Sequence, residues 1–70
     1  MGQGEVIELL EKNGGWMTAR EITKELGILI YRIESVRRAL RVMYKNNEIL
    51  RKEMTRKNHG AWYQWKIREN

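Results

Sequence analysis

The chain has 70 residues, of which 41% are apolar and 33% are charged, and its net charge is +5. This balance predicts one small folded domain, at residues 1–70, rather than a disordered segment. No apolar run approaches the ~20 residues of a membrane-spanning helix, and no leader is evident, so we expect a cytoplasmic protein. The sequence has no cysteine, which excludes a disulfide framework.

Charge is unevenly distributed along the chain. Residues 1–27 carry three cations and five carboxylates, a net charge of −2, whereas residues 28–70 carry eleven cations and four carboxylates, a net charge of +7. This division favours a surface with one acidic and one basic side. The plainer alternative is that the lysines and arginines only keep the surface hydrated, and their positions must decide between the two.

The first predicted helix lies at about residues 4–13. Val6, Leu9 and Leu10 recur at helical spacing, and Gly14 follows as a left-handed stop.

A short strand is expected next, near Trp16 and Met17. Thr18 and Glu21 then have the spacing of a capping box, which predicts a second helix at about residues 19–26.

A third helix is expected at about residues 31–46, because four apolar residues form one buried stripe there: Ile33, Val36, Leu40 and Met43. The stretches "EILRKEM" and "AWYQWKI" then read as two strands joined by a polar turn, a β-hairpin at about residues 48–67. The predicted fold class is therefore α+β.

The segment "TAREITKELGILIYRIESVRRAL" resembles a helix-turn-helix. Its apolar positions, counted from the central Gly27, match the motif at Ile22, Leu26, Ile28, Ile33 and Val36. With three helices followed by a hairpin, most of the chain resembles the winged helix-turn-helix DNA-binding domains of small transcription regulators in bacteria and archaea. Two departures stand out: Thr23 occupies a position where the motif usually has a small alanine, and the stretch from Gly27 to Asn47 is about three residues longer than the compact pattern.

The resemblance implies that the third helix enters the major groove, but the extra length leaves its register open. The strict register turns toward DNA Leu29, Ile30, Tyr31, Glu34, Ser35 and Arg38. A shift of three residues turns toward DNA Arg32, Ile33, Glu34, Arg37, Arg38 and Arg41. Placing Val36 at the centre of the core instead exposes Arg41, Lys45, Arg38, Tyr31 and Ser35, with Arg37 at the edge. Arg38 belongs to all three sets.

Arginine suits this position because it can make a bidentate contact with guanine, while further cations bind phosphates. The alternative is that these cations pair with nearby carboxylates. Only Glu34 is close enough in sequence to reach Arg37 and Arg38, so most of this positive charge is expected to be unpaired.

The hairpin is the predicted wing. Alternation puts Tyr63 and Trp65 on the face that seals the hairpin onto the helices. The wing tip is expected to reach phosphates or the minor groove through Lys52, Arg56, Lys57, Asn58 and His59. Three roles remain open for Trp62: packing against Lys66 or another wing side chain, a dimer contact, or stacking on bases.

Catalysis and metal binding are not indicated. The chain has no Asp and no Cys, and Ser35 lies within a predicted helix while His59 lies in a turn. We therefore expect no enzyme activity, no cofactor and no metal.

The sequence predicts a nucleoid-associated transcription regulator whose partner is double-stranded DNA. The DNA-binding residues are expected to be Tyr31, Arg32, Ser35, Arg37, Arg38, Arg41, Lys45, Lys52, Arg56, Lys57, Asn58 and His59. The alternatives are a winged-helix module for protein contact or RNA binding, and a structural chromatin protein. A homodimer is compatible with either, and no small-molecule effector site is evident.

Overall fold

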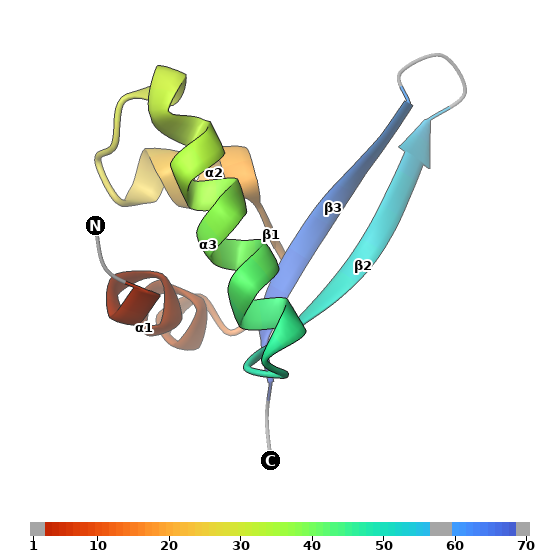
Figure 1. The fold of residues 1–70 in the computed structure, drawn as a ribbon, viewed down its shortest axis with the longest axis horizontal. Coiled ribbons are helices and arrows are strands. Elements are labelled where there is room, and N and C mark those ends of the chain that lie inside the picture. The colour runs from red at the N-terminus through yellow and green to blue at the C-terminus, as the bar shows by residue number, and fades with distance from the viewer. Residues whose placement is uncertain (1–2, 57–59, 69–70) are drawn as a thin grey trace.

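The computed structural model describes residues 3–56 and 60–68. In chain order the elements are α1 (Gln3–Asn13), β1 (Met17–Thr18), α2 (Ala19–Glu25), the 3₁₀ helix η1 (Ile30–Arg32), α3 (Ile33–Lys45), β2 (Ile49–Arg56) and β3 (Gly60–Ile67). Three helices and a three-stranded antiparallel sheet form an α+β fold, in which the β2–β3 hairpin leaves the helices at an angle (Figure 1). None of the described helices is long and apolar enough to cross a membrane.

The ends of α1 and α2 are capped by the residues that the sequence indicates. Gly14 has a φ of 71°, and its N–H donates to the carbonyl of Leu10 at 2.9 Å. Before α2, the Thr18 N–H donates to the Glu21 carboxylate at 3.0 Å, and the Glu21 N–H donates to the Thr18 hydroxyl at 3.1 Å. This reciprocal pair confirms the capping box.

The α-helical part of the third helix begins at Ile33, two residues after the expected start. The reason is local: Leu29 is extended, and the Arg32 N–H donates to its carbonyl at 2.8 Å, which closes a tighter 3₁₀ turn. Arg32 itself, with φ −96° and ψ 12°, separates the two helices. The extra length between Gly27 and α3 is therefore taken up by an extended residue and η1.

The sheet has the order β1-β3-β2. β2 and β3 pair along their whole length, from Ile49 opposite Ile67 to Arg56 opposite Gly60. The short β1 pairs only with the base of β3, where Met17 lies opposite Trp65. The outer half of β3 therefore has a neighbouring strand on one side only.

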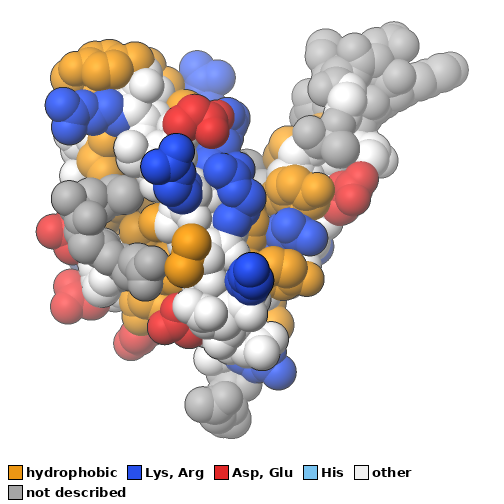
Figure 2. All heavy atoms as spheres, viewed as in Figure 1, with side chains coloured by type: hydrophobic (Ala, Val, Ile, Leu, Met, Phe, Trp, Pro, Cys, Tyr) orange, Lys and Arg blue, Asp and Glu red, His pale blue; other side chains and the backbone are white. Residues whose placement is uncertain are grey.

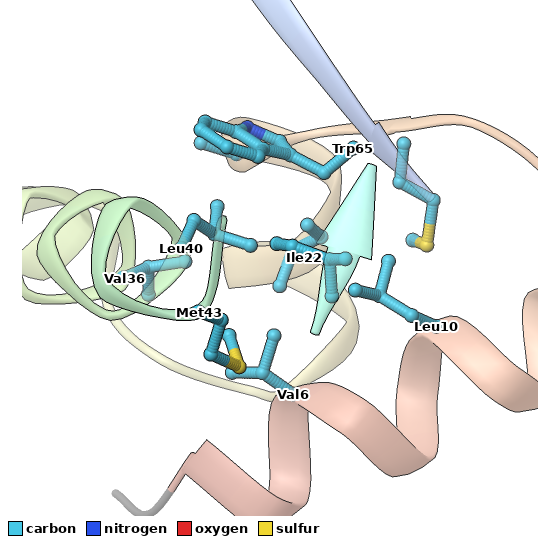
Figure 3. Packing of buried hydrophobic residues seen from close by; sticks show 10 residues of the cluster. Val6, Leu10, Ile22, Val36, Leu40, Met43 and Trp65 are labelled. Carbon is cyan, nitrogen blue, oxygen red and sulfur yellow. The ribbon is translucent and has the colours of Figure 1, made fainter. Parts of the chain in front are cut away.

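The core lies where the three helices meet the base of the sheet (Figure 3). Every described element except η1 contributes to it, through Val6, Leu10, Met17, Ala19, Ile22, Val36, Leu40, Met43, Ile49 and Trp65. The expected stripe of the third helix is buried at Val36, Leu40 and Met43, while Ile33 is partly buried against the cluster. Trp65 closes the core from the sheet side, as strand alternation predicts.

Candidate nucleic-acid interface

One side of α3 is exposed and basic. Because Val36, Leu40 and Met43 turn the opposite side inward, Arg38, Arg41 and Lys45 point to solvent. Lysine and arginine side chains follow α3 across the front of the molecule, and the described part of the hairpin lies beside them (Figure 2). An exposed helix with a row of cations can approach a polyanion without moving any other element.

The charges on this side are largely uncompensated. Arg37 donates from Nη1 to the Glu34 carboxylate at 2.7 Å, and both side chains remain well exposed. No ion pair links Arg38, Arg41 or Lys45 to any residue in the described part of the chain. The structure thus agrees with the sequence-based expectation that Glu34 compensates only part of the positive charge.

The residues before α3 form an apolar end of the molecule. Tyr31 is 73% exposed on η1, next to Leu29 at 61% and Ile30 at 52%. Arg32 ends η1, and Ser35 lies exposed on the first turn of α3. Tyr31 and Arg32 therefore stand at one end of the basic row rather than on the α-helix itself.

The structure corrects the position of Lys52, which was expected at the tip of the hairpin. Lys52 lies opposite Gln64, well inside the hairpin, and its Nζ is 4.7 Å from the ring centroid of Trp16. Lys66 approaches the same ring at 5.9 Å, so this face of the sheet places two cations around Trp16. In the β2–β3 register, Lys52 lies four residue pairs before Arg56, the last residue of β2.

The other residues predicted at the wing tip begin at the end of β2. Arg56 is the last residue of β2, but its side chain is not described. Lys57, Asn58 and His59 lie outside the described residues.

A groove of about 600 Å³ lies between α3 and the outer half of β3. Its walls bring together three aromatic side chains of β3 and three arginines of α2 and α3: Trp62, Tyr63, Trp65, Arg20, Arg37 and Arg41. The space-filling view shows the molecule hollowed between the helices and the projecting hairpin (Figure 2). We refer to this feature as the aromatic–arginine groove.

Sequence reasoning missed Arg20 as a candidate. The residue lies in the first turn of α2, immediately after the capping box, and β1 pairing brings that turn beside β3. The capping box locates the start of α2, but only the β1–β3 register shows that this start faces the hairpin.

The hairpin is held to α3 by a cation placed between aromatic rings. The Arg51 Cζ lies 4.2 Å from the ring centroid of Tyr44 on α3 and 4.3 Å from that of Tyr63 on β3. Trp65 completes the cluster, with ring centroids 6.2 Å from Tyr44 and 5.9 Å from Tyr63. Tyr63, expected to seal the hairpin, is still 39% exposed and packs through this cluster. The stacked guanidinium thus helps to set the angle between α3 and the hairpin.

The fold has a counterpart among solved structures. A protein from Methanosarcina mazei Go1, described as a "possible transcriptional regulator", superposes with a TM-score of 0.81 and 15% sequence identity. The match covers 99% of this chain but 57% of the other, so this chain spans little more than half of that protein's length. At this identity the likeness shows the fold alone. No protein-family model and no curated protein matches the sequence.

Proposed function

We propose that the chain is a winged helix-turn-helix domain that binds double-stranded DNA as a transcription regulator. In this proposal α3 lies in the major groove and the β2–β3 hairpin is the wing, on the backbone or in the minor groove. The observation that carries it is the exposed row of Arg38, Arg41 and Lys45, which forms no ion pair with any described residue.

The geometry favours different contacts for different residues along the exposed face of α3. An α-helix fits the major groove of B-DNA, where arginine can contact guanine O6 and N7 together. Arg38 lies in the middle of the exposed face and is our candidate for base contact. Arg41 and Lys45 continue the row toward the C-terminal end of α3, where cations suit phosphates.

The role we propose is binding and not catalysis, with no cofactor. The fold likeness to a protein described as a possible transcriptional regulator supports a regulatory role. The basic side of α3 supports an anionic partner over an apolar protein surface, and the exposed helix has the shape that fits the major groove of duplex DNA.

A charge-matched pair of variants tests the proposal. Arg41→Gln with Lys45→Gln removes two cations from the α3 face, whereas Lys12→Gln with Lys24→Gln removes two exposed cations from α1 and α2. Anisotropy titrations of a labelled duplex should show a log–log salt slope of about −4 to −5 for the wild type, if ~4–6 phosphates are contacted. The first pair should reduce that slope by about one unit per lost contact, and the second pair should leave it nearly unchanged.

Equal effects of the two pairs would contradict the placement of DNA on α3. A regulator should also prefer a sequence selected from a random pool by a ratio of ~10³ or more over random duplex. A ratio near one would favour a structural chromatin protein, and weak, sequence-independent binding without a salt dependence would favour a protein-contact module.

A further inference from the structure

Three consecutive apolar residues are exposed where the chain leads into α3. Leu29, Ile30 and Tyr31 each present more than half of their surface to solvent. A run of exposed apolar side chains is unfavourable in water and is typical of a contact surface. The space-filling view shows hydrophobic side chains at the end of the molecule where η1 lies, next to side chains of lysine or arginine (Figure 2). The described part of the chain leaves this apolar surface uncovered.

The residues on either side of the run show that its exposure is selective. Ile28 and Ile33 are partly buried against the core cluster. Between them, the extended Leu29 and the 3₁₀ turn of η1 carry the chain away from the core, and the Arg32 N–H closes this turn by donating to the Leu29 carbonyl at 2.8 Å. The apolar run thus divides into residues that pack in the fold and residues that the fold holds in solvent.

The apolar end is continuous with the basic side of α3. Arg32 ends η1, and Arg32, Ser35 and Arg38 line one hollow of about 650 Å³ at this end of the helix. Glu5 of α1 adds one carboxylate to the same hollow. The partner that covers this end therefore presents negative charge and apolar groups close together.

The proposed function places this end in the major groove, because recognition helices contact base edges with their N-terminal residues. The base edges in that groove offer hydrogen-bonding groups and one apolar group, the C5-methyl of thymine. We propose that Leu29 and Ile30 contact thymine methyl groups and so give the binding site a preference for thymine near the base pair that Arg38 contacts. The inference rests on the proposed function, because it needs α3 in the major groove.

Helix geometry predicts where these thymines lie. The chain advances about 1.5–2 Å per residue in η1 and α3, so Ile30 lies ~12–16 Å along the helix from Arg38. One base pair spans ~3.4 Å of the DNA axis. The contacted thymines are therefore expected within about five base pairs of the pair that Arg38 contacts.

Deoxyuridine tests the inference, because it differs from thymidine in the base only by the missing methyl group. In a duplex that the wild type selects from a random pool, each thymine is replaced in turn by deoxyuridine, and the affinity is measured. Loss of one contacted methyl should weaken binding of the wild type about 4-fold. The sensitive positions should be one or two thymines within the expected distance, and replacement elsewhere should have no effect.

Variants assign the effect to the apolar end. Leu29→Ala with Ile30→Ala should bind the thymine and deoxyuridine duplexes equally, with the salt slope of the wild type, because no charge is removed. Leu50→Ala is the matched control, since Leu50 is an exposed leucine on β2, opposite Lys66, and should keep the full discrimination. Thermal melting confirms that each variant is folded. If the double variant does not fold, the two single substitutions make the same comparison.

The outcomes separate this inference from the proposed function. No effect of deoxyuridine at any position, or an equal loss in the double variant, would overturn the thymine contact while duplex binding at α3 stands. Failure of the wild type to bind any duplex would overturn both. Self-association of the wild type that the double variant abolishes, without discrimination between thymine and deoxyuridine, would assign the apolar end to a second copy of the chain instead.

Discussion

Thr23 is fully buried in α2, at the position where the helix-turn-helix pattern usually has alanine. Its hydroxyl donates to the carbonyl of Ala19 at 2.7 Å, so the polar group is satisfied within its own helix. The departure from the pattern is thus accommodated by one local hydrogen bond and by space for one methyl group.

Replacing Thr23 should separate these two contributions. Thr23→Val keeps the side-chain volume and removes only the hydroxyl's hydrogen bond, to a carbonyl that also accepts a backbone hydrogen bond within the helix. It should therefore change the free energy of unfolding by less than about 1 kcal/mol. Thr23→Ala also empties the methyl site and should cost ~1–1.5 kcal/mol. Urea denaturation measures both, and a loss for Thr23→Val as large as that for Thr23→Ala would show that the hydroxyl contributes more than the packing of the methyl group.

Arg38 is exposed on α3 and belongs to every set of residues that the sequence assigns to the DNA-facing side of this helix. If it reads a guanine, Arg38→Ala should weaken binding to a selected site by ~1–3 kcal/mol and relax the preference at one base pair. Its exposed position predicts an unchanged melting temperature. Binding measured on the selected site and on single-base variants checks this, and an equal loss on every sequence would reassign Arg38 to a phosphate.

At the scale of elements, α3 is followed by a residue in the left-handed conformation. Asn47 has a φ of 62°; its N–H donates to the Tyr44 carbonyl at 3.0 Å, and the Glu48 N–H donates to the Met43 carbonyl at 2.9 Å. This Schellman pattern satisfies the last carbonyls of the helix and aims the chain into β2.

The cap predicts opposite effects for two substitutions. Asn47→Ala should destabilise the fold by ~1 kcal/mol, because the left-handed conformation is unfavourable for alanine but is tolerated by asparagine. Asn47→Gly should be at least as stable as the wild type. Thermal denaturation of both, with Asn46→Ala at φ −86° as the control, tests the cap; a stable Asn47→Ala would argue against it.

The angle of the hairpin depends on Arg51. Arg51→Lys keeps the charge but lacks the planar group that stacks between Tyr44 and Tyr63. We expect a loss of ~1 kcal/mol in unfolding free energy and a weaker affinity for duplex DNA. The salt slope should stay the same because no charge is removed. An unchanged affinity, measured where both the wild type and the variant are folded, would mean that the hairpin angle does not affect binding.

Sequence patterns capture what is local in these elements. The T-x-x-E spacing locates the start of α2, and strand alternation places Trp65 inward, because both signals lie within a few residues. The apolar "ILIY" run does not distinguish a tight 3₁₀ turn from the beginning of an α-helix, so the sequence leaves the start of the third helix open. Lys52 meets Trp16, and Arg20 meets the hairpin, only through β1–β3 pairing between distant segments. Contacts of that kind have no short-range signature.

At the scale of the whole molecule, the uneven distribution of charge along the sequence places acidic and basic side chains over different elements of the fold. Acidic side chains gather over α1, while lysine and arginine follow α3 toward the hairpin (Figure 2). A polarised field of this kind orients an approaching polyanion before contact and raises the association rate at low salt. The aromatic–arginine groove borders the same basic side, because Arg37 and Arg41 of α3 line it.

Trp65 joins the sheet to the helical core, because it lies in β3 at the position where β1 pairs on one side and β2 on the other. It is 3% exposed, lies opposite Met17 in β1 and Arg51 in β2, and contacts the ring of Tyr44 on α3. Trp65→Ala should cost ~3–5 kcal/mol, a large part of the stability available to 70 residues. Circular dichroism should then show loss of folding at or near room temperature, whereas Trp16→Ala, half-buried beside Lys52, should remain folded. A folded Trp65→Ala variant that has lost only DNA binding would place this tryptophan in the interface and shift the strand register by one residue.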